Sequence, residues 1–336
     1  MKKYFIITAF ILAVLGGCKP EKRREVIDVQ AETIPAESLE PNTAALRLAE
    51  PNQPALPGLQ AELSIPPEEP NKIQQQSSPA GPSTTERLFG KCGRLLQKYV
   101  DAAGNVNYKA LNVGREDLKE ILAAFASLDP NDYSVWPRND QIAFWINTYN
   151  LCTLKIIIDN YPIKPNPFKT ILYPPNSIMQ IASPWNRYTF SVMKVKYTLR
   201  EIERNIFLRE FADVRTCFAL TYASVSGARL RNEAYTGQKL QTQLNSQIIE
   251  FLSNREGFAI DTQEARVYLS AVFKWYSDSF VEKFGTTTQF GDKAPELRAI
   301  LNFICGYIDR KDVDYLARKN YSVLYRKYDW TLNEAK

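Results

Sequence analysis

Histidine is absent from all 336 positions of this chain. It is the side chain that most often serves as general base, proton shuttle or metal ligand near neutral pH. Mechanisms built on Ser-His-Asp, on a Cys-His pair or on a histidine-ligated metal are therefore excluded within this chain.

A second absence is local, because residues 19–83 contain no Phe, Trp or Tyr while holding 11 of the 20 prolines. Such a segment cannot bury enough apolar area to offset the entropy of ordering its backbone. We expect a disordered tether with a net charge of −4, which as a flexible coil would reach on the order of 45 Å. Its composition favours a passive spacer over the alternative, a binding segment for a basic partner.

The apolar run at the amino terminus, Tyr4 to Val14, is shorter than the roughly 20 residues needed to cross a bilayer. Two lysines precede it, and the following Leu15-Gly16-Gly17-Cys18 resembles the lipobox of bacterial lipoproteins. On that resemblance Cys18 becomes the lipid-modified first residue of an exported, membrane-anchored chain. Lys19 replaces the aspartate that retains enterobacterial lipoproteins at the inner membrane, so we expect the outer membrane, facing the periplasm. An ordinary cleaved signal or an uncleaved anchor is the alternative.

Residues 84–336 are long enough for one globular domain. A capping-box pattern at Ser83 and apolar spacings predict the helices, and alternating or continuous apolar runs predict the strands. The expected helices run from Ser83 to Tyr99, Arg115 to Leu128, Asn139 to Asp159, Thr198 to Leu208, Leu240 to Phe251 and Pro295 to Ile308, and the expected strands cover 189–192, 195–197, 217–223, 266–270 and 321–325. The helix at 139–159 is apolar on most sides, which indicates a central buried helix. Without repeated strand-helix units, the pattern predicts an α+β class: a single, mostly helical domain with a small sheet.

Six motifs occur in an order that resembles the bacterial and plant family of unknown function called DUF547. They are Gly104 to Tyr108, Gln141 to Asn150, Asn160 to Pro162, Tyr197 to Glu203, Leu230 to Tyr235 and Tyr328 to Asn333. The resemblance covers roughly Leu88 to Asn333, and Trp275-Tyr276 also resembles a family segment, which we interpret as core. The family's histidine and cysteine positions have invited comparison with papain-like or transglutaminase-like thiol enzymes, which is an analogy only.

The chain departs from the family at the positions that a thiol mechanism would need. Arg204 and Cys217 replace histidines, and Tyr222 and Gly227 replace cysteines. A cysteine nucleophile needs a thiolate, usually promoted by a nearby histidine, and neither partner remains in register. These departures from the family weaken the case for a thiol mechanism in this chain. We expect Cys217 to be an inert buried thiol.

No metal site or cofactor is expected, because the four thiols of the domain show no C-x-x-C spacing and no histidine could complete a zinc site. The thiols concerned are Cys92, Cys152, Cys217 and Cys305. An exported compartment permits disulfides among them, with three full pairings left open.

The retained polar residues are the candidates for a ligand pocket: Asn147, Asn150, Glu203, Arg215, Ser224 and Glu233. Asn147 and Asn150 share one face of the buried helix, where they either fix a ligand or tie down a loop. Glu203, Arg215 and Glu233 are expected to form a buried ion-pair network, with an acid/base pair as the alternative.

Together these patterns favour a binding or scaffolding role in the cell envelope, with an envelope polymer or a protein as partner. Nucleic acid is not expected, because the domain's charge of +7 contains no dense run of Lys or Arg. The alternative is a hydrolase or transferase with a papain/transglutaminase-like site or one based on carboxylates and amides. An open pocket lined by Asn147, Asn150, Glu203 and Arg215 would favour the enzyme, and a filled interior would favour binding.

Overall fold

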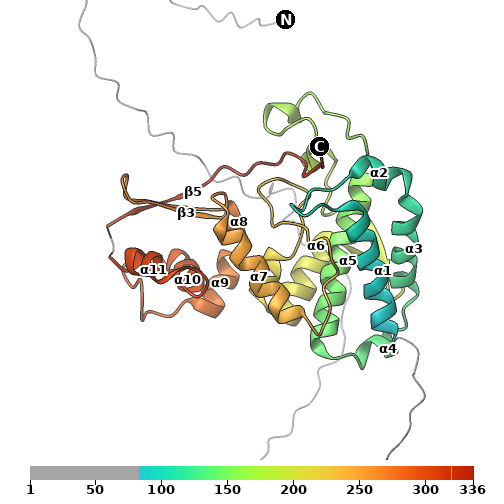
Figure 1. The fold of residues 1–336 in the computed structure, drawn as a ribbon, viewed down its shortest axis with the longest axis horizontal. Coiled ribbons are helices and arrows are strands. Elements are labelled where there is room, and N and C mark those ends of the chain that lie inside the picture. Colours follow the sequence, from blue (N-terminus) through green and yellow to red (C-terminus); the bar gives the residue numbers. More distant parts are fainter. Residues whose placement is uncertain (1–82, 319) are drawn as a thin grey trace, which may run out of the picture. The chain divides into compact units, whose positions relative to one another are not determined.

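The computed structural model describes residues 83–318 and 320–336 of the chain (Figure 1). The signal segment, the lipobox with Cys18 and nearly all of the expected tether lie outside the described residues. Within them, no helix is both long and apolar enough to cross a membrane.

The amino-terminal part of the domain is a group of helices around one buried helix. These helices are α1 (Thr84–Tyr99), α2 (Tyr108–Val113), α3 (Arg115–Ser127), α4 (Pro130–Ser134) and α5 (Arg138–Asp159). The predicted capping box is present, with Ser83 and Glu86 satisfying each other's backbone amides at the start of α1. Helices α1, α2 and α3 pack against α5, and between Ile142 and Ile158 only Lys155 is not buried. The prediction of a central buried helix is confirmed.

A long loop and a hairpin follow α5. The loop holds two short 3-10 helices, η2 (Lys169–Ile171) and η3 (Ile178–Gln180), and leads into the antiparallel strands β1 (Thr189–Val192) and β2 (Val195–Thr198). Met193 and Lys194 form the turn with φ of 50° and 65°, as a two-residue hairpin of matching twist requires. The helix predicted from Thr198 is longer than expected, because α6 (Leu199–Glu201) continues as the π-helix η4 (Ile202–Phe211).

The strand predicted for residues 217–223 is wrong. The segment Val214–Phe218 is a 3-10 helix, η5, capped by Asp213, and the residues after it form no ladder. Burial was predicted correctly, since Cys217 to Ala223 are all buried. A short apolar run fits a buried strand and a buried helical turn equally well, and here the backbone at Ala219 and Thr221 bonds to a side chain of α5 instead of a neighbouring strand.

The carboxy-terminal part contains α7 (Leu240–Ser253), a three-stranded sheet and four further helices. The sheet order is β3 (Phe258–Asp261), β4 (Arg266–Leu269), β5 (Ser322–Tyr325), with β3 and β4 antiparallel and β4 and β5 parallel. The helices are α8 (Ala271–Trp275), α9 (Ser277–Phe284), α10 (Pro295–Ile304) and α11 (Arg310–Ala317). Helix α10 ends four residues earlier than predicted, whereas the mostly helical α+β class is confirmed, with two small sheets in place of one.

The chain end returns to the region where the domain begins. Val106 forms a parallel bridge with Glu334, and the Tyr108 hydroxyl donates to Asn333 Oδ1 at 2.8 Å. Two of the sequence motifs, at 104–108 and 328–333, therefore lie side by side although more than 200 residues separate them. Ser224 and Ser226 contact the same returning segment, so three distant parts of the chain meet there.

Candidate functional site

Glu203 is the centre of a buried polar cluster. It lies on η4, is 3% exposed, and accepts a hydrogen bond at Oε1 from the Tyr276 hydroxyl at 2.9 Å. Arg200 Nη1 lies 3.4 Å from the same oxygen, and the Tyr222 hydroxyl is hydrogen-bonded to the Tyr276 hydroxyl. We call Arg200, Glu203, Tyr222 and Tyr276 the Glu203 cluster. It brings together Glu203 and Tyr222, which the resemblance treats as a matching and a departing position.

Aromatic rings fill the space around the Glu203 cluster. The Tyr222 ring lies 5.8 Å from the Trp275 ring and 6.2 Å from the Trp185 ring, measured between centroids. Trp185 donates from Nε1 to the Tyr149 hydroxyl at 3.1 Å, which places a further buried phenol beside the cluster. The aromatic residues around the cluster come from four parts of the chain: α5, the loop before β1, the segment after η5, and α8.

Burial raises the pKa of the Glu203 carboxyl, and the neighbouring Arg200 charge and the Tyr276 hydrogen bond offset this only in part. The second carboxyl oxygen, Oε2, makes no hydrogen bond of standard geometry to any described residue. Burial likewise raises the pKa of Tyr276 and of Tyr222 well above the ordinary value of a phenol. Burial therefore favours the neutral forms of Glu203, Tyr222 and Tyr276 more than water does.

The thiol of Cys217, another of the substituted positions, is also buried. Cys217 is 1% exposed on η5, and its pKa is raised well above the ordinary value, first by burial and then by the Glu203 and Asp213 charges. Cys92 and Cys152 are buried as well, and Cys305 is half-buried. Among the described residues no disulfide forms, so these four thiols are free. The environment of Cys217 is the opposite of the electropositive, accessible surroundings that activate a cysteine.

Asn147 and Asn150 both tie down backbone. The Asn150 amide donates to Ala219 O at 2.9 Å and accepts from Thr221 N at 2.8 Å. Asn147 does the same for Tyr235, with distances of 2.8 Å to its carbonyl oxygen and 3.0 Å from its amide nitrogen. Of the two alternatives stated from the sequence, the structure shows the loop-fixing one.

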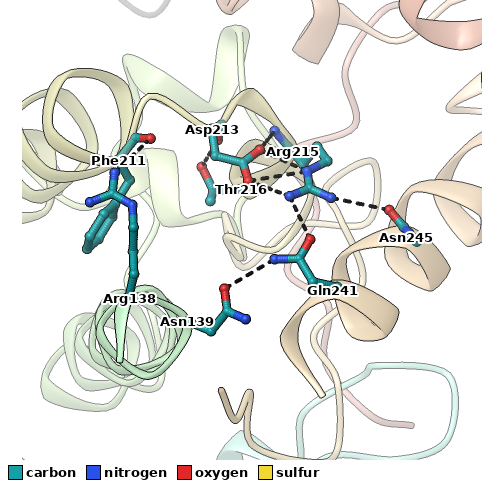
Figure 2. A network of polar contacts seen from close by, with 8 residues as sticks. All are labelled: Arg138, Asn139, Phe211, Asp213, Arg215, Thr216, Gln241 and Asn245. Atoms are coloured by element: carbon teal, nitrogen blue, oxygen red, sulfur yellow. Dashed lines mark hydrogen bonds and ion pairs between the residues drawn. The ribbon is translucent and has the colours of Figure 1, made fainter. Parts of the chain in front are cut away.

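Arg215 lies apart from Glu203, in a network at the junction of η5, α5 and α7 (Figure 2). Its guanidinium donates two hydrogen bonds to the Asp213 carboxylate, from Nη2 to Oδ2 at 2.7 Å and from Nε to Oδ1 at 3.0 Å. It also donates to Gln241 Oε1 at 2.9 Å. Gln241 in turn donates to Asn139 Oδ1 at 3.2 Å, so Figure 2 shows the chain of contacts crossing from η5 through α7 to the start of α5.

The predicted network of Glu203, Arg215 and Glu233 is therefore wrong. Glu233 pairs with Arg231 at 2.6 Å, Arg215 with Asp213, and Glu203 with Arg200. Each charge takes an opposite charge two or three residues away in the chain, and the three pairs lie on different elements. Of the candidate pocket residues Asn147, Asn150, Glu203, Arg215, Ser224 and Glu233, only Ser224 borders the cleft described next.

Ser224 and Gly227 border a cleft of about 250 Å³. Its walls come from the loop before α2, the loop at 224–229, the second half of α7 and the returning chain end. The lining residues are Ala103, Gly104, Asn105, Ser224, Val225, Gly227, Ala228, Arg229, Gln247, Glu250, Phe251, Asn254 and Asn333. The Ser224 hydroxyl is hydrogen-bonded to the Tyr328 hydroxyl at 2.7 Å.

Two glycines shape this cleft. Gly104 has φ of +78°, and a β-carbon there would lie 2.2 Å from Arg229 Cγ, so no other residue fits without moving the wall. A β-carbon at Gly227 would lie 2.9 Å from the Tyr328 hydroxyl and 3.0 Å from Ser224 Oγ. The family cysteine that the resemblance assigns to this position would therefore stand against Ser224 and Tyr328, whereas glycine leaves the space open.

Hydrogen bonds within the protein fix the polar groups of the cleft wall. Arg229 and Glu250 form an ion pair, and the Asn333 amide donates to Gly104 O at 3.0 Å while accepting from Tyr108. The wall presents amides, one hydroxyl and a neutralised charge pair, but neither a thiol nor a histidine. Across residues 83–318 and 320–336 no group of three His, Cys, Asp or Glu side chains could hold a metal ion.

Sequence reasoning missed Tyr276, Arg229 and Glu250 as site residues. Tyr276 was interpreted as core, and its burial agrees, but its hydroxyl is the hydrogen-bond donor to Glu203. The i, i+3 spacing of Arg200 and Glu203 on a predicted helix was the available signal for their pairing. No sequence signal links Arg229 to the chain end at Asn333.

Comparison with known families gives one match, to the family described as "Protein of unknown function, DUF547", over residues 133–252. This segment includes α5, η4, η5 and most of α7, and with them Asn147, Asn150, Glu203 and Tyr222. The predicted resemblance to DUF547 is confirmed over this segment. The comparisons with curated proteins and with solved structures found no match.

Proposed function

We propose that the chain is a lipid-anchored envelope lipoprotein whose domain, which matches a family of unknown function over residues 133–252, binds a ligand without chemically transforming it. The lipobox-like Leu15-Gly16-Gly17-Cys18 supports the anchor. The Glu203 cluster is the observation that supports ligand binding without catalysis. It occupies the interior where the resemblance would require a thiol site.

Each substituted position is chemically unsuited to thiol catalysis. Arg204 is exposed, and its guanidinium offers hydrogen-bond donors but no acceptor. The Tyr222 hydroxyl is committed to Tyr276, and the thiol of Cys217 is buried. Gly227 has no functional group. The side chains near the retained Glu203 therefore stabilise the fold and leave no nucleophile for a substrate.

The cleft beside Gly227 is the surface that we assign to ligand binding. Its donors and acceptors come from fixed amides, and the charges of Arg229 and Glu250 cancel within the wall. Such a wall fits a neutral, hydroxyl-rich ligand better than an ion. The volume of about 250 Å³ is near the lower end for small-molecule sites, about 300 Å³, so it suits one sugar-sized unit of a longer glycan.

The test is co-sedimentation of the chain with purified peptidoglycan, an insoluble glycan polymer. The cleft variant Arg229→Ala/Glu250→Ala removes two side chains of the cleft wall together with their ion pair, and we expect it to bind at least about fivefold more weakly. The matched control Lys91→Ala/Glu120→Ala removes a surface ion pair between α1 and α3 and should bind as the parent does. Equal binding by both variants would refute the assignment of the cleft as the ligand-binding surface. Release of soluble glycan fragments by the parent would refute the non-catalytic role.

The anchor is tested separately. Cys18→Ser should abolish incorporation of a labelled lipid and make any membrane association of the chain removable by a high-salt wash. Lipid labelling that persists in this variant would contradict the lipobox interpretation.

A further inference from the structure

The loop between α5 and β1 presents three large apolar side chains to solvent. Phe168 is 84% exposed, Ile171 81% and Leu172 64%, and they sit on and around η2. We call these three residues the apolar tip. Exposed apolar residues are ordinary when scattered singly, but three within five consecutive positions form a patch that indicates an interaction surface.

The apolar tip is held in place by the rest of its loop. Lys169 Nζ donates to Met179 O at 2.9 Å and to Ile181 O at 3.0 Å, which attaches η2 to η3. Gln180 accepts from Asn166 N at 2.9 Å and donates to Pro174 O at 3.0 Å. Lys169 is bound inward between Phe168 and Ile171. The fold therefore holds the side chains of the apolar tip pointing outward.

The same loop also has a proper inner face. Ile178, Met179 and Ile181 are buried against the core, at 0%, 7% and 5% exposure. The loop thus sorts its apolar residues into an inward set near η3 and an outward set near η2. Since the inward set already anchors the loop, the outward set does not serve packing within the domain.

The chain segment that carries the apolar tip is basic. Residues 160–200 contain six Lys or Arg and no Asp or Glu, and Lys164 is exposed four residues before Phe168. Glu334, which accepts from the Tyr161 hydroxyl at 2.5 Å, is the acidic group bonded at the base of the loop. An apolar set that is flanked by basic residues fits the headgroup region of an anionic bilayer, where the apolar side chains enter and the cations remain at the phosphates.

We propose that the apolar tip docks the domain onto an anionic lipid surface, with Phe168, Ile171 and Leu172 inserted at the boundary of headgroups and acyl chains. The proposed anchor at Cys18 would supply only proximity, because about 65 residues separate it from Ser83. Docking by the tip itself does not require the lipid.

The experiment uses the full chain carrying Cys18→Ser, so that the lipid cannot contribute. Co-sedimentation is measured with vesicles of phosphatidylethanolamine and phosphatidylglycerol, and with neutral phosphatidylcholine vesicles. We expect Phe168→Ser/Ile171→Ser/Leu172→Ser to lower the partition coefficient on anionic vesicles by at least about tenfold. The control Val113→Ser/Val135→Ser/Ile249→Ser also removes three exposed aliphatic side chains, from other elements, and should leave the coefficient unchanged.

All variants share the same amino-terminal segment, so a difference between the two triple variants reports the tip alone. Equal partition of the two triple variants would overturn the proposal, as would equal binding of the parent to neutral and anionic vesicles. Concentration-dependent dimerisation that the tip variant abolishes, without vesicle binding by the parent, would assign the tip to a second copy of the chain instead. None of these outcomes depends on lipidation or on the cleft.

Discussion

Replacing Tyr276 with Phe tests the Glu203 cluster by deleting one oxygen atom. The hydroxyl donates to Glu203 Oε1 at 2.9 Å and is hydrogen-bonded to the Tyr222 hydroxyl. Phe keeps the ring that fills the interior, so no large cavity forms, and the change in the free energy of unfolding reports the hydrogen bonds.

The magnitude follows from the two bonds lost. A buried intramolecular hydrogen bond contributes about 0.5–1.5 kcal/mol net, and leaving a buried partner unsatisfied costs about 1–3 kcal/mol. Tyr276→Phe removes both bonds, and Tyr222 is 1% exposed and so cannot turn to water. We expect the free energy of unfolding to fall by about 2–4 kcal/mol.

Urea unfolding followed by tryptophan fluorescence measures this change. Tyr325→Phe is the control, because Tyr325 is 37% exposed and should shift stability by less than about 0.5 kcal/mol. A Tyr276→Phe variant that is as stable as the control would show that the cluster contributes nothing to the fold, and would remove the basis for assigning it a structural role.

Three further predictions concern the cluster, the buried amides and the tether. Because the folded pKa of Glu203 is raised above the ordinary 4.5, its stabilising contribution is complete below that pH and is lost as pH rises through the folded value. Glu203→Gln should therefore flatten the fall in the free energy of unfolding on the alkaline side of 4.5, and an unchanged pH profile would contradict this. Asn150→Ala leaves Ala219 O and Thr221 N unpaired, so it should lower the free energy of unfolding in urea by about 2–4 kcal/mol. The control Asn131→Ala, at an exposed position, should lower it by less than about 0.5 kcal/mol, and equal effects would be inconsistent with the loop-fixing role. A chain beginning at Ser83 should unfold cooperatively within roughly 1 kcal/mol of the mature chain, and a larger loss would show that residues 19–82 pack.

Much of the fold could be predicted from local sequence signals. The capping boxes at Ser83 and Thr198, the even apolar distribution along α5 and the alternation in the hairpin each depend on neighbours within a few residues. The strand at 217–223 failed because its backbone partners come from Asn150, about 70 residues away. Strand β3 was missed, because four residues with only partial burial give a weak alternation signal.

The site could be predicted only in part, for the same reason. Asn147 and Asn150 were recognised as buried polar residues from the helix face they share, and Glu203 from the family resemblance. Their partners Tyr235, Ala219 and Tyr276 lie 69 to 88 residues away. Nearest-charge pairing along the chain would have assigned Arg215 to Asp213. The cleft needs the return of the chain end to Gly104, and the exposure of the apolar tip needs the orientation of its loop; neither is encoded in local spacing.

The rate at which iodoacetamide labels Cys217 in the native chain tests the central claim most directly. Cys217 is 1% exposed with a raised pKa, and Cys305, half-buried with its pKa raised to about 11, serves as the internal reference. At pH 8 a thiol with a pKa near 11 should hold roughly 200-fold less thiolate than a free thiol whose pKa is about 8.5, and should therefore react more slowly. The account predicts that Cys217 reacts more slowly still than Cys305. Rapid stoichiometric labelling of Cys217, with a thiolate pKa below about 8.5, would contradict it and make this residue a catalytic nucleophile.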